Sequence, residues 1–137
     1  MSMQIAGTAP RAEGRLLRFA LKLDAAVTGA NALAYLAAFA LLDGLLGIDA
    51  GVLVAVGAFL AVYAALVYRL ATSATMPHAA VVGVIAANAL WAVDSLIALG
   101  LDWFTPTTLG QVVIAVQAVG VAAFAALQYL GLRGRAA

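Results

Sequence analysis

The residues best placed to do chemistry lie in one apolar stretch, 81–101, which carries Asn88, Trp91, Asp94 and Ser95 near its middle. A carboxylate in hydrocarbon is costly, about 2.5–3.5 kcal/mol on insertion scales. The folded protein must therefore offset the cost of Asp94. Ionisable residues inside membranes are functional candidates for this reason. We accordingly take Asp94 as the centre of the candidate site.

Amide and hydroxyl side chains in other apolar segments fall at a similar depth. With a helical rise of about 1.5 Å per residue, they lie within about two turns of Asp94. We expect Gln117 to be the hydrogen-bond partner of Asp94, with Asn31 and Tyr35 next. The candidate ligand-binding residues are Asn31, Tyr35, Asn88, Trp91, Asp94 and Gln117.

The same residues have a purely structural interpretation. A neutral Asp94 hydrogen-bonded to Gln117 would act as a packing device between helices. The chain has no cysteine, which excludes disulfides and thiolate catalysis. It has a single histidine, His78. We therefore expect neither a metal site nor a cofactor.

Composition decides the class of protein. The chain has 137 residues, of which 66% are hydrophobic and 9% charged, and its mean hydropathy is +1.11. Soluble domains are about 45–50% apolar and about 25% charged. A soluble domain of this size could not hide so much apolar surface, so lipid must be its solvent. A net charge of +1 predicts no attraction to nucleic acid.

The apolar segments predict an all-α membrane protein, a bundle of four transmembrane helices. The predicted spans are residues 24–46, 52–70, 79–101 and 109–132. A short basic amphipathic helix precedes them within a single domain of residues 11–137, and residues 1–10 are expected to form a flexible tail.

One face of the first predicted span is polar. Asp24, Thr28, Asn31 and Tyr35 follow a spacing of four, three and four, so they share a helical face. Such a stripe should face the bundle interior or a watery cavity. Alternatively, Thr28 and Asn31 only join neighbouring helices by hydrogen bonds.

The charges predict the topology. Arg11, Arg15, Arg18 and Lys22 also share a helical face and are expected to contact lipid phosphates at the membrane surface, or only to anchor the topology. Every other Lys or Arg lies at Arg69 or in the C-terminal tail. The positive-inside rule therefore predicts a multi-pass protein of the cytoplasmic membrane with both termini in the cytoplasm.

The sequence contains a weak internal repeat. Residues 30–33, Ala-Asn-Ala-Leu, recur at 87–90, and residues 64–68 resemble 125–129. Segments two spans apart run in the same direction, so this would be a parallel repeat of two hairpins. Asn31 and Asn88 would then be symmetry mates facing one another across the bundle.

Three segments, KLDAAVTGANALAYL, AANALWAVDSL and FAALQYLGLR, resemble a broad set of small four-span proteins of high-GC bacteria rich in Ala, Val and Leu. The resemblance covers the spans as a whole and brings no activity with it. The size also suits small multidrug transporters, fluoride channels and DoxX-like proteins. However, the first span lacks the Glu of the transporters, and the chain lacks the Asn-Gly signature of the channels.

Three functions remain open. The chain could bind or move a small molecule, ion or proton through a polar interior, working as a homodimer or larger assembly. It could be a membrane-embedded isomerase or cyclase acting on a lipophilic isoprenoid or polyketide, with Asp94 as general acid. It could also be an accessory subunit without a ligand. A pocket of about 300 Å³ or more is required by an enzyme, and an accessory subunit needs none.

Overall fold

The computed structural model describes residues 2–101 and 105–136, and the side chains of residues 14–101 and 105–134. The chain forms four helices, α1 (Ser2–Leu46), α2 (Ala50–Thr72), α3 (His78–Gly100) and α4 (Thr108–Ala136). Each is long and apolar enough to cross a bilayer. The predicted four-helix membrane bundle is confirmed, and the ends of α2 and α3 lie close to the predicted ones.

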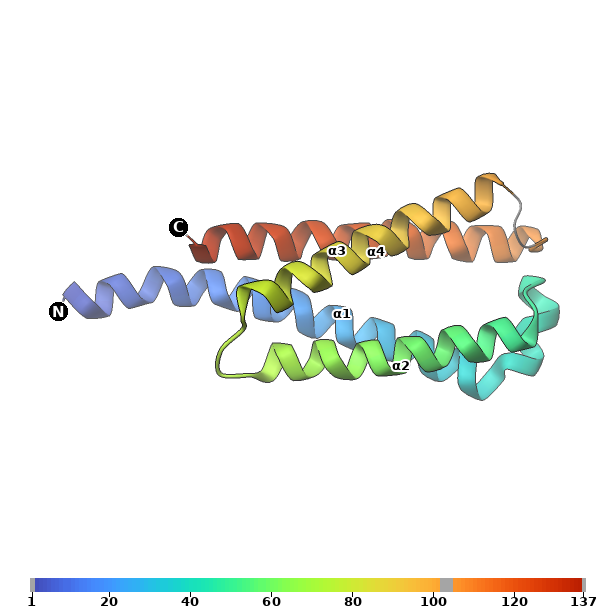
Figure 1. Cartoon of the computed structure of the whole chain (residues 1–137), viewed down its shortest axis with the longest axis horizontal. Coiled ribbons are helices and arrows are strands. Elements are labelled where there is room, and N and C mark those ends of the chain that lie inside the picture. Colours follow the sequence, from blue (N-terminus) through green and yellow to red (C-terminus); the bar gives the residue numbers. More distant parts are fainter. Residues whose placement is uncertain (1, 102–104, 137) are drawn as a thin grey trace.

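The helices run alternately in opposite directions (Figure 1). Both termini and the α2–α3 connection lie at one end of the bundle, here called the terminal end. The α1–α2 connection, the end of α3 and the start of α4 lie at the other, the loop end. The basic N-terminal segment and the first span form one continuous helix, α1, which departs from helical geometry at Ala38 (φ −123°, ψ 23°).

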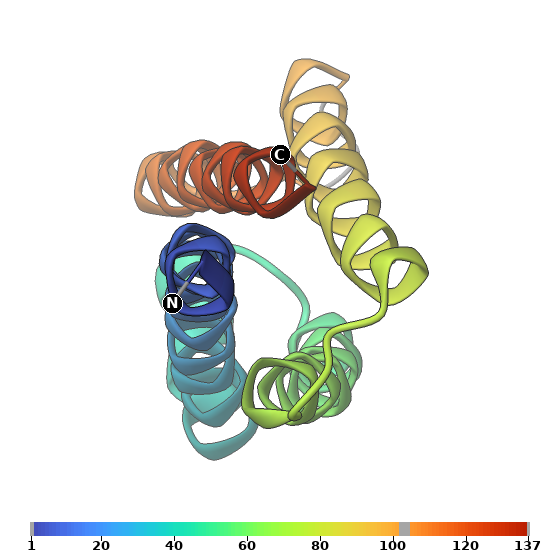
Figure 2. The same cartoon turned by 90° about the vertical axis from the view of Figure 1, so that its left-hand side faces the viewer.

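Helix packing is uneven around the bundle (Figure 2). Helix α1 packs along both α2 and α4, and α3 packs on α4, whereas α2 and α3 scarcely touch. Glycines allow the close contacts of α1. A Cβ atom at Gly131 of α4 would lie 2.8 Å from the Leu17 backbone nitrogen, and one at Gly57 of α2 would lie 3.1 Å from the Tyr35 Cβ. The bundle is therefore tight on either side of α1 and loose between α2 and α3.

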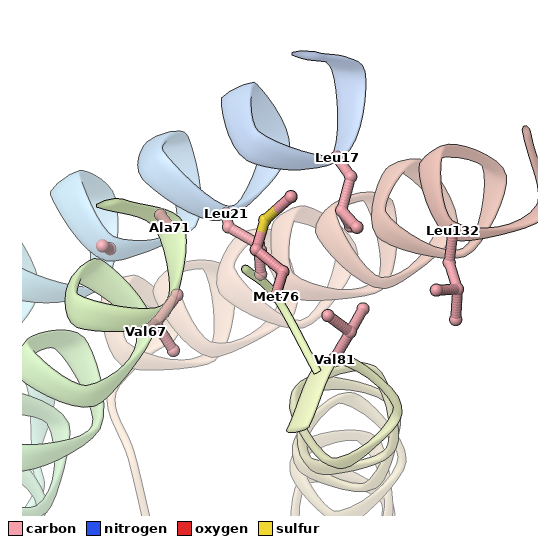
Figure 3. Packing of buried hydrophobic residues seen from close by; sticks show 8 residues of the cluster. Leu17, Leu21, Val67, Ala71, Met76, Val81 and Leu132 are labelled. Carbon is pink, nitrogen blue, oxygen red and sulfur yellow. The ribbon is translucent and has the colours of Figure 1, made fainter. Parts of the chain in front are cut away.

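Apolar side chains close the terminal end (Figure 3). They come from all four helices and from the α2–α3 connection, and we call them the terminal core. Its members are Leu17, Leu21, Ala25, Val67, Ala71, Met76, Val81 and Leu132. Since each is at most 8% exposed, the interior of the bundle is shut off at this end.

Arg18 holds the α2–α3 connection against the terminal core. Its Nη1 donates hydrogen bonds to the backbone oxygens of Ala71 at 2.5 Å and Ser73 at 2.7 Å. A cation suits the carbonyl-rich C-terminus of a helix. The guanidinium, expected to face lipid phosphates, thus binds protein backbone. Arg15 and Lys22 are exposed as expected, and the Arg11 side chain lies outside the described residues.

The loop end is joined by Thr107, which precedes α4. Its Oγ1 donates to the backbone oxygen of Leu45 at 2.7 Å, and its backbone N–H donates to that of Leu46 at 3.0 Å. Gly47, with φ +68°, ends α1 in the left-handed conformation that favours glycine. These contacts fix α1 to α4 at the end where α2 and α3 diverge.

Candidate functional site

A carboxylate is buried in the middle of the bundle, and it belongs to Asp24 of α1. The residue is 1% exposed. Its Oδ2 accepts hydrogen bonds from Asn88 Nδ2 at 2.7 Å and Gln128 Nε2 at 2.8 Å. Its Oδ1 accepts one from Thr28 Oγ1 at 2.9 Å. Donors from α1, α3 and α4 therefore converge on one acid.

Asn88 connects this acid to the remaining helix. Besides binding Asp24, its Nδ2 donates to Gln128 Oε1 at 3.0 Å, and its Oδ1 accepts from the Tyr63 hydroxyl at 3.0 Å. We call Asp24, Thr28, Tyr63, Asn88 and Gln128 the Asp24 cluster. Each helix supplies at least one member, and no buried side-chain nitrogen or oxygen of the described residues lacks a partner.

The electrostatics of the cluster are unusual for a membrane interior. Within residues 14–101 and 105–134, no basic side chain hydrogen-bonds to Asp24. The nearest basic residues along α1 are Lys22, which is exposed, and Arg18, which binds α2 backbone. An ionised carboxylate can only accept hydrogen bonds, and the three donors suit that form. Among the described residues, the contacts that stabilise the acid are thus hydrogen bonds from neutral groups.

A second polar group lies nearer the loop end. The Gln117 Nε2 donates to the Tyr35 hydroxyl at 2.9 Å and to Asn31 Oδ1 at 3.4 Å, and the Tyr35 hydroxyl donates to Gln117 Oε1 at 3.1 Å. We call these three residues the Gln117 cluster. It ties α1 to α4.

Asp94 is placed differently from the prediction. Its expected hydrogen bond with Gln117 is absent, because Gln117 binds Tyr35 and Asn31 instead. Asp94 is exposed, and its carboxylate forms no hydrogen bond with the part of the chain that the structure describes. It lies six residues beyond Asn88 on α3, about 9 Å nearer the loop end.

The Asp94 side chain lines a cavity of about 310 Å³, here called the Asp94 cavity. All four helices contribute to its walls, which are mainly apolar. Polar groups enter from Tyr35, Asp94, Ser95 and Gln117. Residues 52–56 of α2 face residues 91–98 of α3 across it, so the cavity occupies the part of the bundle where these two helices separate.

Two further cavities extend the hollow toward the Asp24 cluster. One of about 460 Å³ is lined by Thr28, Asn31, Trp91 and Gln117 among others. One of about 50 Å³ is lined by Thr28, Tyr63, Asn88 and Trp91 among others. Trp91 borders all three cavities, and Thr28 borders the two that adjoin the Asp24 cluster. These cavities thus lie between the two polar clusters, and the larger one is also bordered by the exposed side chains of Val27, Val112 and Val116.

Aromatic rings bridge the loose side of the bundle at mid-depth. Phe59 of α2 stacks on Trp91 of α3, with ring centroids 5.8 Å apart and planes at 3°. Phe59 also stacks on Tyr63, at 6.1 Å and 15°. The same three rings line the cavity of about 50 Å³.

The six predicted ligand-binding residues therefore divide into three places. Asn88 belongs to the Asp24 cluster, Asn31, Tyr35 and Gln117 form the Gln117 cluster, and Trp91 and Asp94 line the hollow between and beyond them. Asn31 and Asn88 do not face one another, since they belong to different clusters.

Sequence reasoning missed Asp24 as the centre of the buried network. Two signals pointed to it: the polar stripe that begins at Asp24, and the shared face of Gln117 and Gln128 on the fourth span. Asp24 begins the predicted first span, whereas α1 continues as a helix on both sides of this position.

The chain matches no protein family, no curated protein and no solved structure. Among the residues that the structure describes, no group of His, Cys, Asp and Glu could hold a metal ion. The function is therefore argued from the cavities and the two acids.

Proposed function

We propose that this membrane protein binds a small lipophilic cation in the Asp94 cavity. The observation that carries the proposal is the cavity itself, about 310 Å³, mainly apolar and lined by all four helices around one acid. Ligand sites have this character, with apolar walls and a few convergent polar groups.

The acid indicates the charge of the ligand. Asp94 lies within a span and has no basic partner in the described part of the chain. A charged side chain at this depth is expensive unless it is paired. A ligand cation would supply the missing partner, and the ring of Trp91 could attract the same charge through its π face. Tyr35 and Gln117 would orient polar substituents.

The packing of the helices supports entry from the membrane. Since α2 and α3 scarcely touch, a lipophilic molecule could enter between them near the loop end. The terminal core closes the opposite end. If both termini are cytoplasmic, as the basic residues predict, the opening faces the outer leaflet. Translocation would additionally require the terminal core to open.

The test uses two isosteric probes, benzyltrimethylammonium and its neutral carbon analogue neopentylbenzene. Binding to the protein in nanodiscs is followed by Trp91 fluorescence in a Trp103→Phe background. The cation should bind more tightly than the neutral probe. Asp94→Asn should remove about 1.4 kcal/mol or more of this preference, which is about tenfold in affinity. Asp43→Asn, the same charge change outside the cavity, should have no effect.

Equal binding of both probes, or an unchanged preference in Asp94→Asn, would contradict the cation site.

One observation favours a second function, which is that an acid lines an apolar cavity large enough for an enzyme substrate, about 310 Å³. In that case Asp94 would be the general acid of an isomerase or cyclase acting on a lipophilic substrate. Multiple turnover of a polyisoprenoid without a cationic group, lost in Asp94→Asn, would favour the enzyme.

A further inference from the structure

Asp24 is a titratable group that the cation site does not use, and its surroundings are those of a proton site. We propose that Asp24 binds a proton at Oδ1, delivered through the hydroxyl of Thr28 from the cavities that Thr28 borders. The proposal does not rest on the cation site, because Asp24 does not line the Asp94 cavity.

The two carboxylate oxygens of Asp24 have different partners. Oδ2 accepts from two amides, Asn88 and Gln128, which cannot give up protons under ordinary conditions. Within residues 14–101 and 105–134, Oδ1 accepts only from the Thr28 hydroxyl. A hydroxyl has one donor and two acceptor lone pairs, and its hydrogen rotates to suit its partner. Oδ1 can therefore gain a proton while Oδ2 keeps both of its hydrogen bonds.

The proton step is balanced through Thr28. A hydronium ion in the cavity gives a proton to Thr28 Oγ1 as the hydroxyl proton of Thr28 passes to Asp24 Oδ1. One O–H bond breaks on hydronium and one on Thr28, and one forms on each acceptor. The acid becomes neutral, and Thr28 then accepts from Asp24 and donates toward the cavity.

Access to this site is one-sided. Thr28 borders the cavities of about 460 Å³ and about 50 Å³, whereas Asp24 itself lines none of the cavities described above. On its other side lies the terminal core, which includes the neighbouring residue Ala25 together with Leu21. Protons therefore reach Asp24 from the hollow and not from the terminal end.

The groups that face Asp24 leave the proton as the natural counter-charge. They are Thr28 from α1, Tyr63 from α2 through Asn88 of α3, and Gln128 from α4. Tyr63 is the one titratable member of this set, and it carries no positive charge. If the contact were purely structural, an asparagine at position 24 could join the helices equally well. It would carry no charge and would not need three hydrogen-bond donors to stabilise one.

The test is infrared spectroscopy of the full chain in liposomes, following the carboxylic-acid C=O band as the pH is lowered. A band component that appears on acidification should be lost in Asp24→Asn and kept in Asp94→Asn. Because this readout uses no ligand, its failure is distinct from failure of the cation site. An unchanged band in a folded Asp24→Asn variant would overturn the proposal.

A second pair of variants keeps the acid in place and tests the route. After a rapid pH drop, the Asp24 band should appear more slowly in Thr28→Val, which lacks the hydroxyl. It should appear at the wild-type rate in Thr28→Ser, which retains it. Equal rates in all three proteins would overturn the route through Thr28. Loss of the band on replacing K⁺ by Na⁺ at constant pH would instead identify a sodium site and overturn the proton site.

Discussion

Replacing Asn88 by alanine should detach α3 from the rest of the bundle more than any other single amide substitution. Asn88 is 4% exposed, and its side chain makes three hydrogen bonds, one each to Asp24, Gln128 and Tyr63. Measured side-chain hydrogen bonds between membrane helices average about 0.6 kcal/mol and reach about 1.7 kcal/mol. Three such bonds give an expected loss of about 2–5 kcal/mol in the free energy of unfolding.

The assay is reversible unfolding with SDS in mixed micelles, followed by circular dichroism. The matched control is Asn31→Ala, the same substitution at the position that the internal repeat pairs with Asn88. Asn31 is half-buried and accepts one long hydrogen bond of 3.4 Å, so its loss should stay below about 0.6 kcal/mol. Equal losses in the two variants, or a loss below about 1 kcal/mol for Asn88→Ala, would refute the central role of Asn88.

Two further substitutions test the contacts that close the terminal end, using the same unfolding assay. Arg18→Gln should cost about 1.5–3 kcal/mol, because it removes charged hydrogen bonds to the end of α2. The exposed Arg15→Gln should stay within about 0.5 kcal/mol of wild type, and equal effects would argue against the clamp. Gly131→Ala should destabilise by about 1–3 kcal/mol, because its methyl group would strike the Leu17 backbone. In Gly120→Ala no atom lies within 4 Å of the new methyl group, so this variant should be neutral or more stable, and a loss in both would contradict the tight α1–α4 contact.

The fold could be predicted from the sequence because lipid leaves few choices. In hydrocarbon, every backbone polar group must be satisfied within the chain, so long apolar segments become helices. The predicted spans 52–70 and 79–101 lie within two residues of α2 and α3, which begin after the N-cap residues Asp49 and Pro77. The exception is α1, because a basic segment with its own amphipathic pattern did not reveal that it continues into the span without a break.

The site could be predicted only in part, because pairing depends on helix rotation and tilt. Helical rise gives the depth of a residue such as Gln117, but depth does not say which face of α4 meets α1. The Gln117 amide, which was expected to hydrogen-bond to Asp94, instead donates to Tyr35 and Asn31. The separation of α2 from α3, which leaves Asp94 beside a cavity, follows from where small residues allow close approach. Single-sequence patterns do not rank such contacts.

Residues that the internal repeat aligns can be compared by how deeply their side chains are buried. Extending the alignment of Asn31 with Asn88 back by seven residues pairs Asp24 with Val81. Both residues are fully buried, at 1% and 0% exposed. A duplicated hairpin would be expected to bury equivalent positions, so this agreement favours the repeat as a hypothesis.

The second motif gives the same result and reveals a division between the halves. It pairs Gln128 with Val67, which are 0% and 1% exposed. Asp24 binds Gln128 between α1 and α4, whereas Val81 and Val67 belong to the apolar terminal core. One pair of equivalent positions thus carries the acid and its amide, and the other packs as valine. This asymmetry places an acid and its amide beside an apolar seal within one chain.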